Sequence, residues 1–333
     1  MGIKNLTKLI KVNSPDSIET SQLHKLSGRK VAIDASLFIY QCLMNVRYNG
    51  KSLKNDNDKV TSHISGIFYK TINYLSMNVT PIYIFDGKPP EEKDEIIKNR
   101  QVRAECAKAG LEKATTDIER EKYEKQCIRL TKTHIDDIKR LLDLMGVSYL
   151  HIDGEAEAVA SELCRIGYVD YVLTEDMDVM AYACPRMIRN CIDSSIKRKD
   201  IVSIITYQTL IDDLQLDHNS FIDFCILCGC DYCPIIPRVG SVTALKLIHK
   251  YKNIETILEN TKYQIPDNYL EQFNAAKENF LLFRDKIDIN TIDIHTSLPS
   301  VKDVENYLIN EIEMHEKRVK NTLKKFHNKY KHE

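Results

Sequence analysis

Four short apolar runs in the first part of the chain each end in acidic residues. The runs lie at 30–33, 81–85, 147–152 and 171–174, and the acids that follow them are Asp34, Asp86, Glu155 with Glu157, and Asp176 with Asp178. Helical patterns at 62–75, 133–144 and 156–166 separate the runs. Strands that alternate with helices of this length predict an α/β fold with a mostly parallel central sheet flanked by helices. In such a sheet the carboxyl ends of parallel strands meet at one edge, so we expect the acids to converge there.

Six carboxylates in one crevice need cations, since mutual repulsion would otherwise raise their pKa values and leave several of them protonated. Asp231, in a turn rich in Pro and Gly at 229–240, could join them. Oxygen ligands suit Mg²⁺ or Mn²⁺. Two such ions about 3.5–4 Å apart activate a water and stabilise the leaving oxygen of a phosphodiester. Taken singly, each acid could be only a helix cap or a first-turn acid. The acids do not identify the substrate either, since phosphatases, nucleases and other hydrolases all use metals bound by carboxylates.

Composition places the chain among intracellular proteins with a substantial core. The 333 residues carry a net charge of −1 and are 43% hydrophobic, which allows two domains or one domain with an insertion. No stretch approaches the roughly 20 apolar residues of a membrane span, and the lysine-containing segment 1–11 does not resemble a signal peptide. Ten cysteines without a secretion signal indicate reduced thiols. We therefore expect neither a secreted nor a membrane protein.

Two further regions stand out from the alternating pattern. Residues 91–145 are long, charged and helix-prone, which is more than a crossover between strands requires and is typical of either a surface helical hairpin or a mobile cover over a site. From about residue 220 the pattern is helical, with helices expected at 221–228 and 241–251 around the turn at 229–240.

Five segments in this order and spacing resemble the flap endonucleases, a family of structure-specific 5′ nucleases. The segments are 31–36, 84–90, 154–158, 174–178 and 229–233, and the resemblance extends from residue 1 to about residue 251. It implies the PIN-like 5′ nuclease fold, with a helical arch inserted into the nuclease domain and a helix–two-turn–helix after it. The implied domains are 1–90 and 133–219 for the two parts of the nuclease domain, 91–132 for the arch, and 220–333 for the helix–two-turn–helix and C-terminal helical region.

The resemblance also implies a catalytic site. The family's seven active-site carboxylates match Asp34, Asp86, Glu155, Glu157, Asp176, Asp178 and Asp231. They would hold two Mg²⁺ ions, for which Mn²⁺ can substitute. The implied reaction cuts DNA near the junction of a single-stranded 5′ flap with duplex, leaves a 5′-phosphate and a 3′-hydroxyl, and serves replication and repair. Lys93 and Arg100 match basic catalysts that would offset charge on the scissile phosphate.

Nine further positions match DNA contacts of the family. They are Gly2, Tyr40, Arg47, Thr61, Lys70, Arg103, Arg129, Arg238 and Gly240. In the family Gly2 lines the active site and Tyr40 stacks on a nucleobase beside the cut, a contact worth about 1–3 kcal/mol. The helix–two-turn–helix departs from the family pattern, because Gly240 is kept whereas Ser241 and Val242 follow it in place of basic residues. The resemblance implies a K⁺ ion bound at this turn, where the sequence differs from the family pattern.

Several alternatives remain at this stage. A sister 5′ exonuclease or a junction-resolving nuclease of the same superfamily is one, and a non-catalytic DNA-binding scaffold is another. Cys225, Cys228, Cys230 and Cys233 are spaced like zinc ligands, but the first two lie on an apolar helix, so we do not expect zinc. The expected partner is branched DNA with a 5′ flap. We find no sliding-clamp peptide, and we expect a monomer at a nuclear or cytoplasmic site of DNA replication.

Overall fold

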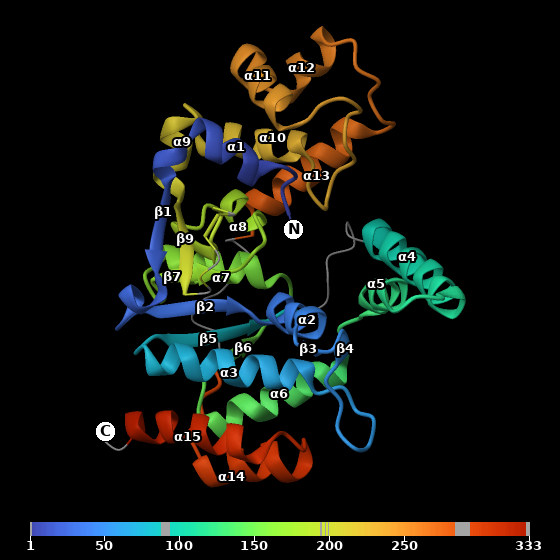
Figure 1. The fold of residues 1–333 in the computed structure, drawn as a ribbon. Coiled ribbons are helices and arrows are strands. Elements are labelled where there is room, and N and C mark those ends of the chain that lie inside the picture. Colours follow the sequence, from blue (N-terminus) through green and yellow to red (C-terminus); the bar gives the residue numbers. More distant parts are fainter. Residues whose placement is uncertain are drawn as a thin grey trace. The chain divides into compact units, whose positions relative to one another are not determined.

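The computed structural model describes residues 2–87, 94–193, 195–196, 198, 200–283 and 294–330 (Figure 1). The chain divides into two compact units that interleave along the sequence. Unit 1 consists of 1–25, 88–93 and 154–292, and unit 2 of 26–87, 94–153 and 293–333. These bounds follow packing, and the domain division expected from the sequence stays a prediction.

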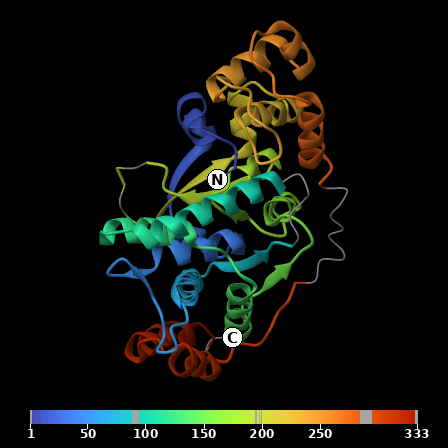
Figure 2. The same cartoon turned by 90° about the vertical axis from the view of Figure 1, so that its right-hand side faces the viewer.

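In the described residues of unit 1, four strands pair in the order β1-β9-β8-β7. They are β1 (Ile18–Gln22), β7 (Tyr171–Leu173), β8 (Arg186–Asn190) and β9 (Ile201–Thr206). β7 runs parallel to β8, whereas β9 is antiparallel to both β8 and β1. The helices of this unit are α1 (Leu6–Asn13), η1 (Pro15–Ser17), α7 (Ala156–Arg165), α8 (Asp178–Ala181), α9 (Tyr207–Asp213), α10 (His218–Cys228), α11 (Ser241–Tyr251), α12 (Ile254–Asn260) and α13 (Tyr269–Leu281). The last four are the yellow to orange helices of Figure 2.

Within the part of unit 2 that the structure describes, three parallel strands pair in the order β2-β5-β6. They are β2 (Lys30–Asp34), β5 (Thr80–Phe85) and β6 (Tyr149–His151), and a separate hairpin pairs β3 (Arg47–Tyr48) with β4 (Lys51–Ser52). The helices are η2 (Leu23–Leu26), which begins in unit 1, α2 (Ala35–Asn45), α3 (Ser62–Ser76), α4 (Asp94–Lys113), α5 (Asp117–Cys127), α6 (Lys132–Met145), α14 (Val301–Asn306), the π-helix η6 (Tyr307–Glu311) and α15 (Glu316–Tyr330). The predicted class, mostly parallel strands flanked by helices, is confirmed.

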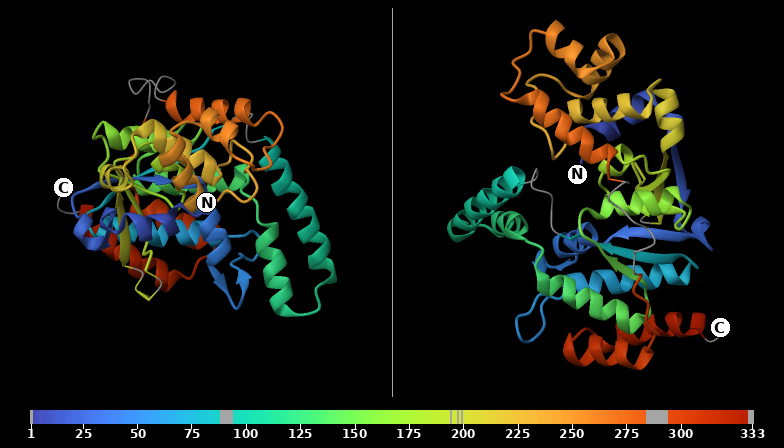
Figure 3. Two further views of the ribbon diagram at one scale, coloured as in Figure 1. Left: turned by 90° about the horizontal axis from the view of Figure 1, so that it is seen from above. Right: turned by 180° about the vertical axis from the view of Figure 1, so that it is seen from behind.

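The charged insertion predicted from the sequence is a pair of helices, α4 and α5. They lie side by side in both views of Figure 3. α5 begins with a capping box, in which the Thr116 side chain accepts from the Glu119 N–H and the Glu119 carboxylate accepts from the Thr116 N–H. The pair packs closely because Gly110 lies against a ring: a Cβ at that position would be 2.5 Å from Cε1 of Tyr123. Helical structure in this insertion is therefore as expected.

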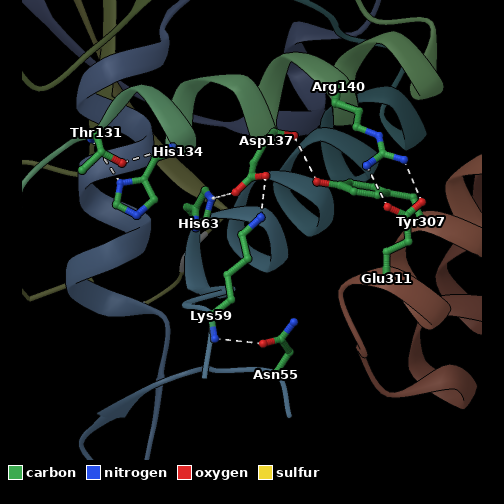
Figure 4. Close-up of polar contacts among 9 residues, drawn as sticks. All are labelled: Asn55, Lys59, His63, Thr131, His134, Asp137, Arg140, Tyr307 and Glu311. Atoms are coloured by element: carbon green, nitrogen blue, oxygen red, sulfur yellow. Dashed lines mark hydrogen bonds and ion pairs between the residues drawn. The ribbon is translucent and has the colours of Figure 1, made fainter. Parts of the chain in front are cut away.

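A polar cluster joins α3 to α6 within unit 2 (Figure 4). Asp137 on α6 accepts from Lys59 Nζ at 2.7 Å and interacts with His63 Nε2 at 3.3 Å. The fully buried His63 ring packs edge-on against His134, with ring centroids 4.7 Å apart. The Tyr307 hydroxyl donates to the backbone carbonyl of Asp137 at 3.3 Å. This cluster fixes α6 against α3 and the C-terminal helices.

Replacing Asp137 by Asn should destabilise the protein in a pH-dependent way. Burial would raise the pKa of Asp137, but hydrogen bonds from His63 and Lys59 outweigh it and the pKa is lowered. The charged carboxylate therefore contributes stability above the unfolded pKa of about 3.9, and this contribution is lost as pH falls through the lower folded pKa. We expect the free energy of unfolding to fall by about 1–3 kcal/mol at neutral pH.

Urea unfolding followed by circular dichroism measures this effect at neutral pH and at about pH 3. Asp136→Asn, an exposed position on the same helix, is the matched control and should change the free energy of unfolding by less than about 0.5 kcal/mol. A difference between Asp137→Asn and wild type that grows on acidification would contradict the assignment.

Candidate active site

Two of the predicted acids lie together at the end of β7 in unit 1. Asp176 and Asp178 are 8% and 3% exposed, and the Asp178 N–H donates to Asp176 Oδ1 at 3.1 Å. Gly2 lies directly against both carboxylates. A Cβ at Gly2 would be 1.9 Å from Asp176 Oδ1 and 2.5 Å from Asp178 Oδ1, and its φ of +72° also favours glycine. The structure thus places Gly2 beside two predicted metal ligands.

The amino-terminal segment is held near these carboxylates by the turn that follows α10. The Lys4 N–H donates to the Gly229 carbonyl at 3.0 Å, and the Gly229 backbone has φ +105°. Asp231, the acid predicted in this turn, comes two residues later. The turn therefore positions both the N-terminal segment and one of the predicted acids.

Glu155, the residue that precedes α7, is held by two tyrosines. The Tyr182 hydroxyl donates to Glu155 Oε2 at 3.2 Å, and the Tyr232 hydroxyl donates to the same oxygen. The two hydroxyl oxygens are 3.1 Å apart. Burial, and then the charge of Glu155, raises the pKa of Tyr182 well above its usual value, so this hydroxyl stays protonated at neutral pH.

The charges of other acids in unit 1 affect the pKa values of Tyr182 and Cys230. The charges of Asp178 and Glu157, together with that of Glu155, contribute to the raised pKa of Tyr182. After burial, which is the largest cause, the charges of Asp178 and Asp231 contribute to the raised pKa of Cys230. Glu155, Glu157 and Asp178 thus all act on Tyr182, and Asp178 and Asp231 both act on Cys230.

Unit 2 holds the other two predicted carboxylates at the ends of neighbouring parallel strands. Asp34 is the last residue of β2 and caps α2, since its Oδ1 accepts from the Leu37 N–H at 2.9 Å. Asp86 directly follows β5. Because Asp34 is paired in register with Ile84, both strands end in an acid at the same edge.

The donor chemistry of these residues fits a hard divalent ion. All seven are carboxylates, which are the ligands that Mg²⁺ and Mn²⁺ prefer. Across the described parts of the chain, no group of three or more His, Cys, Asp or Glu side chains is gathered closely enough to hold an ion. We therefore propose the seven acids as metal ligands because of their chemistry and their positions in the chain.

The four clustered cysteines are buried thiols. Burial raises the pKa of Cys225, Cys228 and Cys230 well above the usual value, and raises that of Cys233 to about 12. All four are buried in the core at and after the end of α10, where free cysteines behave as small apolar side chains.

Curated relatives match this chain along almost all of its length. The flap endonuclease 1 of Glycine max is 40% identical over 335 residues, which cover 98% of this chain and 86% of that protein. The flap endonuclease 1 of Salmo salar is 38% identical over 331 residues, with the same coverage of 98% and 86%. This chain belongs to the flap endonuclease family.

Family models and a solved structure agree with that membership. The XPG N-terminal domain matches residues 1–107, and the XPG I-region matches residues 146–231. The structure of flap endonuclease-1 from Methanococcus jannaschii is similar, with a TM-score of 0.70 and 29% identity, and covers 94% of this chain and 97% of that chain. The predicted family and 5′ nuclease fold are confirmed.

The positions assigned to flap endonuclease basic catalysts lie at the start of the helical insertion. Lys93 lies outside the described residues, and Arg100 falls within α4. Among the described residues, no helix is both long and apolar enough to cross a membrane.

Three side chains that are predicted to contact DNA, those of Arg47, Thr61 and Lys70, are buried or make contacts within unit 2. The buried Arg47 side chain donates to the Gly50 carbonyl at 2.8 Å and to Glu124 of α5 at 3.2 Å. The Lys70 ammonium lies 3.8 Å from the centroid of the Phe38 ring. Thr61 is 4% exposed. These side chains help to hold unit 2 together whether or not they contact DNA.

The other assigned contacts are more accessible. Tyr40 on α2 is half-buried, whereas Arg103 on α4 and Arg129 after α5 are exposed. Arg238 and Gly240 are exposed in the turn before α11, and Arg238 has a left-handed backbone with φ +69°. Nothing in the sequence alone pointed to Tyr182 or Tyr232, although Tyr182 lies four residues after Asp178 and Tyr232 directly follows Asp231.

Proposed function

We infer that this protein is a metal-dependent, structure-specific 5′ flap endonuclease with 5′–3′ exonuclease activity, acting in DNA replication and repair. It hydrolyses a phosphodiester near the junction of single-stranded and duplex DNA and leaves a 5′-phosphate and a 3′-hydroxyl. The observation that supports this most is that all seven acids are present, six of them near a strand end or helix start and Asp231 in the turn after α10. A non-catalytic DNA-binding scaffold would not need seven acids of this kind.

The carboxylates would hold the metal ions. The proposed ligands are Asp34, Asp86, Glu155, Glu157, Asp176, Asp178 and Asp231. Two Mg²⁺ ions, or Mn²⁺ in their place, supply an activated water and stabilise the leaving oxygen. Gly2 has no side chain, so its backbone approaches the carboxylates of Asp176 and Asp178 closely.

Basic and aromatic residues would handle the DNA itself. Lys93 and Arg100 offset the charge that develops on the scissile phosphate, Arg100 through its forked guanidinium. Tyr40 stacks on the base beside the cut. Arg103 and Arg129 contact the single strand as it passes the arch formed by α4 and α5. Contacts of this kind do not depend on base sequence, as suits an enzyme that reads DNA shape.

Duplex DNA would be held elsewhere. Arg238 and Gly240 in the helix–two-turn–helix formed by α10 and α11 hold its backbone, with K⁺ as a possible ligand of the turn. Arg47 and Lys70 contact the template strand, and Thr61 belongs to a pocket for a one-nucleotide 3′ flap. The protein acts as a monomer on branched DNA with a 5′ flap, without a sliding-clamp peptide, at a nuclear or cytoplasmic replication site.

Cleavage of an end-labelled double-flap duplex with Mg²⁺ tests this function. We expect one main product, cut close to the base of the 5′ flap, and slower stepwise removal of nucleotides from a nicked duplex. Nicked, bubble and four-way substrates in the same assay separate the sister activities. Preferential cutting of the four-way junction would identify a junction-resolving nuclease, and no cutting of any substrate would favour the scaffold.

Arg100→Ala should slow the chemical step far more than it weakens DNA binding. Loss of one charge-stabilising donor typically lowers the rate about 10²–10³-fold, and we expect the single-turnover rate to fall in this range while Kd changes less than about 3-fold. Lys108→Ala, an exposed position on the same helix, is the control. Equal losses in rate and affinity for Arg100→Ala would mean that Arg100 only grips the strand.

A further inference from the structure

Three separate segments of unit 1 meet at one oxygen of Glu155. Glu155 precedes α7, Tyr182 follows α8, and Tyr232 lies in the turn after α10. Both tyrosine hydroxyls bind Glu155 Oε2, and they lie 3.1 Å from one another. A carboxylate oxygen that receives phenol hydroxyls from two distant segments has a defined orientation, because neither donor can follow it if it rotates.

The rings of both tyrosines are fixed by aromatic packing. Tyr182 packs on Phe280 and Phe283, with ring centroids 5.1 and 4.8 Å apart. Tyr232 packs edge-on on the same Phe280, with centroids 5.2 Å apart and an interplanar angle of 86°. Phe280, on α13, is fully buried. One phenylalanine thus holds both phenols in rotamers that direct their hydroxyls to Glu155.

The protons available restrict how these groups can bond. Each phenol has a single proton. Either both hydroxyls donate to Glu155, or one donates to Glu155 and the other donates to the first hydroxyl. In both arrangements Oε2 accepts at least one hydrogen bond from a tyrosine, which restrains the position of this oxygen.

We propose that Tyr182, together with Tyr232, is a positioning residue that orients the Glu155 carboxylate for a divalent cation. This inference rests on the proposed function, because it assigns Glu155 to the metal site. The charges of Glu155, Glu157 and Asp178 all raise the pKa of Tyr182, so the three like charges lie near one hydroxyl. Without its hydroxyl partners this side chain would turn away from those charges, and the ligand set would have to be reassembled when the ion binds.

Tyr182→Phe removes the hydroxyl and keeps the ring that packs on Phe280 and Phe283. Loss of a hydrogen-bond partner behind a metal ligand typically lowers metal affinity 10–100-fold, and we expect a loss of about 10-fold in affinity for Mn²⁺. Titration of the DNA-free protein with Mn²⁺, followed by electron paramagnetic resonance, measures this directly. The Mg²⁺ concentration for half-maximal cleavage should rise by a similar factor, with a smaller change in rate at saturating Mg²⁺.

The matched control is Tyr207→Phe. Tyr207 is another buried tyrosine of unit 1, and its hydroxyl lies 2.7 Å from His218 Nδ1. We expect its Mn²⁺ affinity to equal that of wild type. The chain has no tryptophan, so the near-ultraviolet difference spectrum on Mn²⁺ addition reports tyrosines alone. This spectrum should be smaller in Tyr182→Phe than in wild type or in Tyr207→Phe.

The outcomes separate this inference from the proposed function. Wild-type protein that binds no Mn²⁺ would overturn both. Wild-type binding with an unchanged affinity in Tyr182→Phe would overturn the positioning role and leave the function standing. An equal loss in Tyr182→Phe and Tyr207→Phe would show a general packing effect and would also overturn it.

Discussion

Replacing Asp178 by alanine should abolish cleavage while the protein still binds flap DNA. Asp178 is buried beside Asp176 and Gly2, and the proposal makes it a ligand of the catalytic metal. Loss of a ligand removes stabilisation that is needed in the transition state. We expect the rate to fall at least about 10³-fold, which corresponds to about 4 kcal/mol. Rapid-quench single-turnover cleavage with Mg²⁺ measures the rate, and fluorescence anisotropy measures binding.

Asp212→Ala is the matched control for this experiment, since Asp212 is an exposed aspartate on α9 of the same unit. It should cleave at the wild-type rate. If Asp178→Ala also cleaved at the wild-type rate, the assignment of Asp178 to the metal site would be refuted.

Gly2→Ala should lower the cleavage rate about 100-fold without unfolding the protein. The new Cβ would lie 1.9 Å from Asp176 Oδ1, so the carboxylate or the N-terminal segment must move by more than an ångström. A displacement of that size in a catalytic site can cost about 10²-fold in rate. Thermal unfolding and single-turnover cleavage of the same preparation give the two quantities.

Gly167→Ala separates backbone strain from steric conflict. Gly167 has a φ of +78°, similar to the +72° of Gly2, but nothing lies within 4 Å of a Cβ placed there. This variant should lose about 1–2 kcal/mol of stability through the left-handed backbone and cleave normally. If Gly2→Ala cleaved as well as Gly167→Ala, the close approach of Gly2 to the two aspartates would have no role in the reaction.

The sequence predicts the parallel part of the fold well, because that part has strong local signals. The apolar runs at 30–33 and 81–85 became β2 and β5, and the helix expected at 241–251 became α11 with the same bounds. β1, β8 and β9 were not predicted. The sequences of β1 and β8 alternate polar and apolar residues only weakly, and both strands pair with β9, which is distant from β1 in the chain.

The sequence predicted which acids belong to the candidate site but not which other side chains hold them in place. Each acid follows a local signal, the end of an apolar run, so its position could be read from the sequence. The tyrosines that hold Glu155 could not, because their contacts join residues 27 and 77 positions apart. For the same reason the pairing of Arg47 with Glu124, 77 positions away, was not foreseen.

Anomalous diffraction from crystals of the protein with flap DNA and Mn²⁺ would locate the metal ions and their ligands. We expect two peaks about 3.5–4 Å apart, bonded to carboxylates among Asp34, Asp86, Glu155, Glu157, Asp176, Asp178 and Asp231. Absence of any peak at these carboxylates, or peaks bound only elsewhere on the protein, would contradict it.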